Sequence, residues 1–361
     1  MLNCQECDLK IRKKVKVGNI TLGDGNIYIQ SMLKEPACDV EGNIKQALAL
    51  QEAGCDIIRT AVPEKKDVRL IYALKENLKI PVVADIHFDY KIALEAIKAG
   101  ADKIRINPGN LEPDERKRVA FECQKRAVPI RIGVNTGSLE KKLLQEYGLC
   151  AGSLVESAIE SIKLLEEIGF TDIVISVKAS SVKLTVEAYR LLHKKCVYPL
   201  HVGVTEAGTK RLGIIKSAVG IGSLLMDGIG DTIRVSLTEK PLEEIYAARD
   251  LLTAIGLGSG FEVISCPTCG RTKTDLIKLA SEVEKLTDKI NKPQGMNRSL
   301  KIAVMGCVVN GPGEAREADV GVACGNGSGV LFKKGEIVGR FEENQLLDAL
   351  KKAIEELIGR D

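Results

Sequence analysis

Hydrophobic and polar residues repeat as one unit along the first two-thirds of the chain. From about Ile27 to Gly256, short runs rich in β-branched residues alternate with stretches that place apolar residues at three- and four-residue steps. The runs are typical of strands buried on both faces, and the stretches are typical of amphipathic helices. Eight such units at a spacing of roughly 25–35 residues predict a closed (β/α)8 TIM-type barrel. We expect its strands at residues 27–32, 56–62, 81–88, 103–107, 129–135, 172–178, 199–205 and 232–237.

The helical stretches give the same picture. We expect helices at residues 43–53, 92–99, 155–168 and 242–255, each followed by a glycine of the kind that ends helices. An open doubly wound sheet is the alternative α/β fold. No strand is followed by a Gly-x-Gly-x-x-Gly turn, however, and eight even repeats favour closure.

After Gly256 the pattern changes. The stretch 256–260 is rich in glycine, which predicts a flexible connector. We expect a polar helix near 274–287, a strand at 300–305, a strand pair around 330–332 and 337–341, and a last amphipathic helix at 344–358. The sequence therefore predicts a barrel domain over 1–257 and a small α/β domain over 258–361.

Basic residues recur where the predicted strands end. Barrel enzymes build their active sites at the carboxyl ends of the strands, so these side chains would meet at one mouth. Several cations in one pocket repel each other unless an anion neutralises them, and guanidinium groups match phosphate oxygens in pairs. A phosphate or diphosphate ligand is the expectation. The basic residues are Arg59, Arg105, Arg131, Lys178 and Arg234.

Other polar residues at the strand ends suit hydrogen bonding and acid–base work. Glu206 is the candidate acid, in a role that requires burial or a bound anion to raise its pKa. The glycine pair around Gly220 and Gly222, before Ser223, could add the amides of a helix start to the phosphate site. The further candidates are Asp85, His87, Asn107, Asn135, Ser176, His201 and Ser236.

Composition narrows the class of protein. The net charge of +3 comes from 52 basic and 49 acidic residues that are mixed along the chain, so no segment looks like a nucleic-acid arm or a membrane-binding face. The first residues lack the apolar stretch of a signal peptide, and no apolar run is long enough to span a bilayer. We expect a cytoplasmic enzyme without nucleic-acid or membrane partners.

Eleven cysteines are informative in a reducing compartment, because clustered thiols there indicate a metal or redox centre rather than disulfides. The N-terminal Cys4 and Cys7 form an isolated C-x-x-C pair, which reads as an uncommitted pair of thiols. The cysteines without a close second cysteine are expected to fill the core. These are Cys38, Cys55, Cys123, Cys150 and Cys196.

The cysteines after residue 260 form a candidate metal centre. Cys266 and Cys269 lie in a C-x-x-C turn that can direct two thiolates at one site, and Cys307 lies in a second turn rich in Gly and Pro. A zinc ribbon would take Cys324 as its fourth ligand, whereas an iron–sulfur cluster can take an oxygen ligand, which Glu314 offers. Spacing alone leaves both open.

Several motifs resemble one known family along almost the whole chain. The runs SCPTCGRT and GCVVNGPGE, with the barrel segments HVGVTEAG, IRINPGN, IRIGVNTGSL and IRVSLT, are similar to the 4-hydroxy-3-methylbut-2-enyl diphosphate synthase family of the methylerythritol phosphate isoprenoid pathway. The resemblance begins near residue 9 and fits the two-domain bacterial form, without the insert of plant relatives. It implies a barrel followed by a [4Fe-4S] domain that resembles the repeats of sulfite reductase.

The resemblance also implies roles for residues. It makes Cys266, Cys269 and Cys307 the cluster ligands, Glu314 the exchangeable fourth ligand, and Cys324 structural. The implied substrate is 2-C-methyl-D-erythritol 2,4-cyclodiphosphate, which is opened and reduced by two electrons with loss of a hydroxyl as water, and Glu206 would protonate that oxygen. A ferredoxin or flavodoxin donor and a head-to-tail homodimer are implied as well. The residues that would hold the diphosphate are Arg59, Arg105, Arg131, Asn135, Lys178, Arg234 and Ser236.

Two other classes of function compete with this reading. One is a zinc-stabilised barrel enzyme of the pterin or corrinoid methyltransferase type, which metal analysis would separate from an iron–sulfur enzyme. The other is a binding module that uses a zinc ribbon to hold a protein or nucleic acid, against which the near-neutral charge balance argues.

Overall fold

The computed structural model describes residues 12–272, 274–290, 299–307 and 315–359. They fall into two compact units, of which the first ends at Arg249 and the second begins at Asp250. Glu314, Cys4 and Cys7 lie outside the described residues. Among the helices that are described, none combines the length and the apolar character needed to cross a membrane.

The first unit is the predicted barrel. Its parallel strands follow the order β8-β7-β6-β5-β4-β3-β10-β9, and a parallel bridge between Ile175 of β8 and Leu200, just before β9, closes the ring. The barrel strands are β3 (Tyr28–Met32), β4 (Ile57–Ala61), β5 (Val82–Asp85), β6 (Lys103–Ile106), β7 (Ile130–Asn135), β8 (Ile173–Lys178), β9 (His201–Val202) and β10 (Thr232–Ile233).

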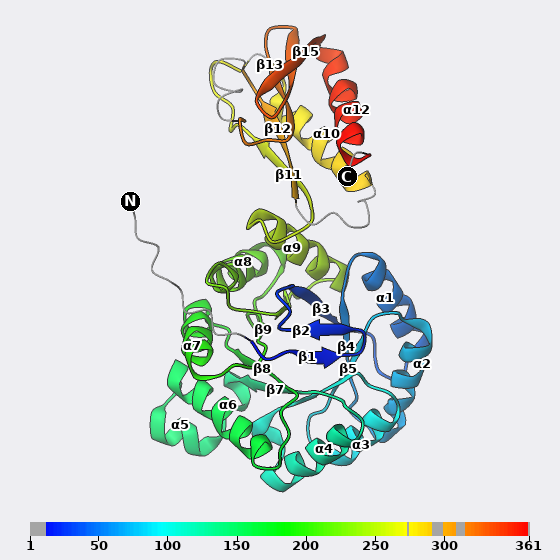
Figure 1. Ribbon diagram of the computed structural model, residues 1–361, viewed down its shortest axis with the longest axis vertical. Coiled ribbons are helices and arrows are strands. Elements are labelled where there is room, and N and C mark those ends of the chain that lie inside the picture. The colour runs from blue at the N-terminus through cyan, green and yellow to red at the C-terminus, as the bar shows by residue number, and fades with distance from the viewer. Residues whose placement is uncertain (1–11, 273, 291–298, 308–314, 360–361) are drawn as a thin grey trace. The chain divides into compact units, whose positions relative to one another are not determined.

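Helices surround the barrel (Figure 1). The glycines that follow four of them have positive φ, as expected for residues that end helices. The helices are α1 (Val40–Glu52), α2 (Arg69–Asn77), α3 (Tyr90–Lys98), α4 (Pro113–Lys125), α5 (Lys141–Tyr147), α6 (Ala151–Glu166), α7 (Val182–Lys195), α8 (Lys210–Met226) and α9 (Pro241–Ala254).

A hairpin closes one end of the barrel. Strands β1 (Val15–Val17) and β2 (Ile20–Leu22) pair antiparallel and lie across the ring in Figure 1. Their buried side chains pack on Ile57, Val83 and Val174, which lie at the starts of three barrel strands. The amino ends of the strands are therefore covered with apolar side chains, and polar chemistry is left to the carboxyl ends.

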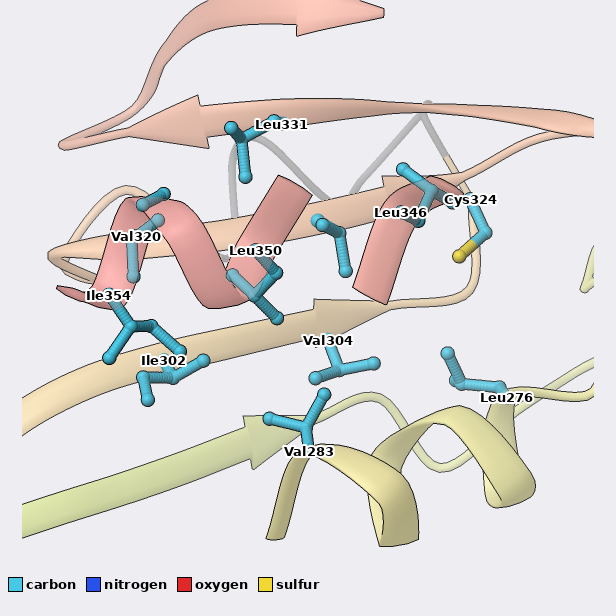
Figure 2. Packing of buried hydrophobic residues seen from close by; sticks show 12 residues of the cluster. Leu276, Val283, Ile302, Val304, Val320, Cys324, Leu331, Leu346, Leu350 and Ile354 are labelled. Carbon is cyan, nitrogen blue, oxygen red and sulfur yellow. The ribbon is translucent and has the colours of Figure 1, made fainter. Parts of the chain in front are cut away.

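The second unit is a five-stranded sheet with helices on one face. The strand order is β11-β12-β13-β14-β15, with the first three strands parallel and the last two antiparallel. Figure 2 shows side chains of α10 and α12 meeting those of β12, β13 and β14 in one hydrophobic cluster. The elements are β11 (Gly260–Ser265), α10 (Leu276–Lys289), β12 (Ser299–Met305), β13 (Val320–Cys324), β14 (Ser328–Lys333), β15 (Glu336–Glu342) and α12 (Leu346–Ile358).

The structure adds two strands to this unit that the sequence pattern did not predict. β11 begins at Gly260, so the predicted flexible connector is wrong at its end, and Gly258 donates its N–H to the Leu252 carbonyl at 2.9 Å. β13 contains Gly321, a residue that weakens strand patterns. A Cβ there would lie 2.5 Å from the Phe332 ring, so packing across the sheet requires the glycine.

Two further predictions are wrong. Cys38 and Cys150 are exposed rather than core residues, whereas Cys55, Cys123 and Cys196 are buried as expected. The Gly220–Ser223 stretch does not begin a helix but lies inside α8, so its amides are used within the helix. Gly220 is needed for close packing, because a Cβ there would lie 2.6 Å from Val204.

Candidate active site

The barrel register brings charged residues of neighbouring strands into one row. Asp85 of β5 pairs with Arg105 of β6, and Arg105 pairs with Arg131 of β7. Residues paired in register on adjacent strands point to the same face of a sheet. All three are at most 3 % exposed, so the row lies buried toward the carboxyl end of the barrel.

Asp85 is the carboxylate around which the cations of this row are arranged. Its Oδ2 accepts a hydrogen bond from Arg59 Nη2 at 2.5 Å and lies 3.2 Å from His87 Nε2, and its Oδ1 accepts one from Arg105 Nη1 at 3.2 Å. Burial alone would raise the pKa of Asp85, but Arg59, His87 and Arg105 hold it well below the usual value. Asp85 is therefore ionised and holds the guanidinium groups in place.

Two glycines leave room for cationic side chains to lie flat against the barrel wall. A Cβ on Gly133 of β7 would lie 2.7 Å from Arg105 Nε, and a Cβ on Gly203, just after β9, would lie 2.7 Å from Lys178 Nζ. Arg105 also donates to the Gly133 carbonyl at 3.2 Å. A larger residue at position 133 would displace Arg105, and one at position 203 would also clash with the Arg234 carbonyl, which would lie 2.5 Å from its Cβ.

Arg131 and Arg234 have partners of different kinds. Arg131 donates from Nη1 to Ser176 Oγ at 3.0 Å, while its Nε and Nη2 are buried without a partner among the described residues. Arg234 Nη2 lies 3.7 Å from Glu244 of α9, a buried carboxylate that also binds Lys34 at 2.9 Å. The two buried carboxylates of Asp85 and Glu244 thus balance only part of the positive charge of a larger group of cations.

The cations of the mouth are close enough to repel one another. Burial lowers the pKa of Lys178 well below its usual value, and Arg131, Arg234, Arg59 and Arg105 lower it further. The pKa of Arg131 is lowered by burial and then by Arg59 and Arg105. This repulsion costs stability, and a bound anion would offset it. The structure therefore gathers all five predicted basic residues into one buried site that fits an anion.

A deeper set of polar side chains was missed by sequence reasoning. Lys103 of β6 is fully buried, and neither its Nζ nor the amide of Gln30 on β3 has a hydrogen-bond partner in the part of the chain that the structure describes. His201, which was predicted, is also fully buried and lies 2.8 Å from Thr232 Oγ1 through Nδ1. The period of two in a strand could have found Lys103, because it precedes Arg105 by two residues.

The other predicted residues lie around the mouth. Both polar atoms of the Asn107 amide are engaged in the loop, with Gly109 and with Ser138. The Asn135 amide lies against Arg105, and with its oxygen turned toward Nη2 it accepts a hydrogen bond at 3.1 Å. Ser236 is half-buried just beyond β10.

Glu206 has an unusual backbone. It is exposed and lies in the loop after β9 with a φ of 51°, in the left-handed region that residues other than glycine rarely adopt. Such conformations cost energy and concentrate at functional sites. The loop is held at both sides, because Thr205 N–H donates to the Ala179 carbonyl at 3.2 Å and Thr238 N–H donates to the Gly208 carbonyl at 3.0 Å.

The second unit brings the later cysteines to one end of its sheet. Cys266 directly follows β11, Cys307 follows β12 by one residue, and Cys324 is the last residue of β13. These strands are parallel and in register, so their carboxyl ends lie together. The Gly306 N–H donates to Cys266 Sγ at 3.3 Å, which places Cys307 next to the C-x-x-C turn.

Cys269 of the turn and Cys324 differ in the surroundings of their thiols. The pKa of the exposed Cys269 thiol is lowered, first by a hydrogen bond from the Arg271 backbone and then by the Arg271 side chain. Burial raises the pKa of Cys324 to about 11, and Glu343 and Cys266 add to that rise. Thiolates bind metals, so the surroundings of Cys269 favour the form of a thiol that binds a metal more than those of Cys324 do. The described residues hold no group of three His, Cys, Asp or Glu side chains at metal-binding distances.

The fold and the site define a TIM-type barrel protein with a group of buried cations at its mouth, followed by a small domain that brings three cysteines to one end of its sheet. The family model of the GcpE TIM-barrel domain matches residues 12–249, and that of the GcpE protein C-terminal domain matches residues 262–356. The chain belongs to the GcpE family.

Curated relatives match over nearly the whole chain. A protein of Caldanaerobacter subterraneus subsp. tengcongensis is 55% identical over 353 residues, which are 97% of this chain and 98% of that protein. One of Clostridium acetobutylicum is 53% identical over 349 residues, 96% of this chain and 98% of that protein. Both are named 4-hydroxy-3-methylbut-2-en-1-yl diphosphate synthase (flavodoxin). These matches do not favour the methyltransferase alternative.

Among solved structures, dihydropteroate synthase from Stenotrophomonas maltophilia with active site-bound imidazole has a TM-score of 0.52 to this chain. The sequences are 14% identical, and the match covers 67% of this chain and 96% of that one. At this identity the likeness shows only that the two chains share a barrel fold.

Proposed function

We infer that this chain is a reductive synthase that converts 2-C-methyl-D-erythritol 2,4-cyclodiphosphate to 4-hydroxy-3-methylbut-2-enyl diphosphate and water. The names of the relatives at 55% and 53% identity support the reaction. The observation that carries it is the excess of buried cations around Asp85, because such an excess favours a multiply charged anion such as a diphosphate.

The reaction determines what the barrel must do. The cyclic diphosphate dianion accepts two electrons and one proton, its ring opens between carbon and a phosphate oxygen, and a hydroxyl leaves as water. The linear diphosphate that remains is a trianion. Negative charge therefore increases on the phosphates while a proton is delivered on the carbon side. Electrostatic stabilisation of that charge and general acid catalysis are the two tasks of the residues.

Arg59, Arg105 and Arg131 would bind the diphosphate oxygens, since their guanidinium groups are already oriented. Asp85 fixes the first two and Ser176 fixes the third, so little reorganisation is needed when the ligand binds. Lys178 of β8, the strand next to β7, and Arg234 just after β10 would complete the site. The buried Arg131 Nε and Nη2, which lack partners among the described residues, are the donors that such a ligand would satisfy.

Glu206 would protonate the leaving hydroxyl. Its side chain is exposed, so of the two conditions for an acid role only the bound anion remains, while the strained backbone in a loop held on both sides supports the position of the residue in the loop. His87, on Asp85, and the buried His201 would contribute hydrogen bonds to the substrate or to its diphosphate site.

The cysteines of the second unit fit an iron–sulfur cluster. Cys266, Cys269 and Cys307 would hold a [4Fe-4S] cluster, since the parallel strands and the bond from Gly306 to Cys266 bring their loops together. Glu314, in the run Asn310-Gly311-Pro312-Gly313-Glu314, is proposed as the exchangeable fourth ligand. When bound there, the cluster would supply low-potential electrons and a Lewis-acidic iron.

We also propose flavodoxin as the electron donor, in line with the names of the relatives, with ferredoxin as the other candidate. A cytoplasmic location fits that donor. The head-to-tail homodimer is a further proposal, which sedimentation of the purified protein would test.

Product identification tests the function. Protein purified without oxygen, loaded with iron and sulfide and chemically reduced, is expected to convert the cyclic diphosphate to the linear allylic diphosphate. Cyclic diphosphate that stays intact with iron-loaded, reduced protein would contradict the proposal.

The acid role of Glu206 has its own test. The Glu206→Gln variant is expected to bind the cyclic diphosphate as the wild type does and to lose turnover, while the exposed Glu187→Gln on α7 serves as control. Unchanged turnover in Glu206→Gln would remove that role.

A further inference from the structure

Lys103 lies one layer below the arginine row. It precedes Arg105 on β6 by two residues, so both side chains point into the barrel about 6.6 Å apart along the strand. Lys103 is fully buried, and its Nζ has no hydrogen-bond partner among the described residues. A lysine without a partner in the centre of a barrel is unusual, because burial of an unpaired charge costs free energy.

The groups around Lys103 are mostly positive or neutral. Among these groups, Arg131 and Arg59 lower the pKa of Lys103 most strongly by their positive charge. The charge of Lys103 in turn lowers the pKa of His201, which is neutral. No carboxylate bonds to Lys103 in the described part of the chain, because Asp85 is engaged by Arg59, Arg105 and His87. The charged and titratable groups on the elements around it are Arg59 on β4, Asp85 on β5, Arg105 on β6 itself, Arg131 on β7, Lys178 on β8, Tyr189 on α7, His201 on β9, Arg234 after β10 and Glu244 on α9.

These surroundings set the charge of Lys103. Burial lowers its pKa from 10.5 to about 7, and the positive charges of Arg131 and Arg59 add to the effect. Above that pH the amine of the empty barrel is neutral. An anion held by the arginines would offset their repulsion and favour the charged amine again.

A change in the charge of Lys103 would serve the proposed reaction. A cyclic diphosphate is a dianion, whereas the linear product is a trianion, so the site must neutralise one more charge at the end than at the start. Arginines cannot adjust, because they stay protonated. A buried lysine can, because its proton is gained or lost according to the field around it.

We propose that Lys103 is a positioning residue that takes up a proton from solvent when an anion fills the arginine site, and that it thereby matches the charge of the barrel to the bound diphosphate. The identity of the ligand rests on the proposed function, but the proton uptake does not. No bond other than that of the proton to Nζ is formed.

Calorimetry measures this proton directly. The cyclic diphosphate is titrated into the oxidised holoenzyme, which does not turn over, at about pH 8 in two buffers of different ionisation enthalpy. Neither the cyclic diphosphate nor sulfate, the second probe, titrates near this pH, so the protons taken up belong to the protein. Wild-type protein is expected to take up protons with either anion.

Each outcome decides a different point. Binding of either anion without proton uptake overturns the proposal for Lys103. Sulfate binding with proton uptake, but without binding of the cyclic diphosphate, overturns the proposed function, and the Lys103→Met variant then decides whether the proton goes to Lys103 or to the buried Lys178. No binding of either anion overturns both.

Variants assign the proton to Lys103. Lys103→Met removes the amine at similar volume, and uptake is expected to fall by about one proton per site. Lys183→Met, an exposed residue on α7, is the control and is expected to keep the wild-type value. Uptake in Lys103→Met equal to that of the wild type would overturn the assignment.

The wild type alone gives a second test if the methionine variant does not fold. Uptake is expected to decline as the pH falls through about 7, because Lys103 is then already charged in the empty barrel. Uptake that stays constant across that range would contradict the proposal. A merely structural lysine would leave the proton count unchanged at every pH.

Discussion

Arg59 and Asp85 form an ion pair inside the barrel, with 2.5 Å between Nη2 and Oδ2 and with the Asp85 side chain fully buried. Asp85 binds Arg105 as well, at 3.2 Å. One carboxylate therefore holds two guanidinium groups that come from strands on either side of it. This relationship makes the cation site possible in the absence of a ligand, and the first prediction follows from it.

Asp85→Asn is expected to lower the free energy of unfolding by about 3–5 kcal/mol, because it leaves two buried guanidinium groups without a counter-charge. Thermal unfolding with and without sulfate checks this, and sulfate is expected to stabilise the variant more than the wild type. Asp114→Asn, an exposed residue on α4, is the control and is expected to change little. An Asp85→Asn protein as stable as the control would mean that the ion pair does not support the barrel.

Gly133→Ala is expected to weaken binding of the cyclic diphosphate by roughly 10–100-fold, the loss expected for a charged hydrogen bond. The added Cβ would lie 2.7 Å from Arg105 Nε and would push the guanidinium group away from Asp85. Gly137→Ala is a matched control in the next turn, where a Cβ would meet open space. Calorimetry on both variants checks the prediction, and equal affinities would show that Arg105 does not need this position.

Cys266→Ser is expected to lose bound iron and sulfide and the brown colour of protein purified without oxygen, because a ligand is removed. Cys324→Ala is the comparison, and it is expected to keep all three, since Cys324 is buried with its thiol pKa raised to about 11. Iron and sulfide analysis and the visible spectrum measure the result. A protein that holds zinc and loses it on Cys324→Ala would instead support a zinc ribbon.

Lys103→Met is expected to raise the free energy of unfolding of the ligand-free protein by about 1–4 kcal/mol near pH 7. The wild-type pKa rises from about 7 in the folded state to about 10.5 in the unfolded state, so between these values the unfolded state binds more protons. The contribution of Lys103 to stability therefore improves as the pH rises through that window.

The advantage of the Lys103→Met variant is accordingly largest at and below about pH 7 and is expected to shrink toward about pH 10. Denaturant unfolding at a series of pH values, compared with the exposed Lys183→Met control, measures it. A constant difference across the series would show that Lys103 does not titrate in this window.

Much of the fold could be predicted from the sequence, because hydrophobic residues recur with a different period in strands and in helices. Eight repeats predicted the barrel, which the structure confirms. The basic residues at the strand ends do lie in one buried group, and anion binding there stays a prediction. The spacing of the cysteines in the sequence singled out the C-x-x-C turn and Cys307 as a candidate metal centre. In the structure, parallel strands bring the loops that carry these cysteines together. The roles of individual residues in binding and catalysis remain proposals.

Only the tertiary structure decided which of these side chains touch and how deep they lie. Asp85 holds Arg105 because the barrel register places them side by side, and it reaches Arg59 diagonally, since Arg59 is paired with Val83 two residues before it. Gly133 matters because Arg105 lies on it, and Gly203 because the Arg234 carbonyl and Lys178 lie on it. Strand β13 was not predicted, since a glycine in a strand is explained by neighbours remote in sequence. The period of two could place Lys103 on the inner face of β6, but how deeply it is buried depends on neighbours remote in sequence. Local periodicity fixes the face on which a residue lies, whereas its charge state and its partners depend on what closure of the barrel packs against it.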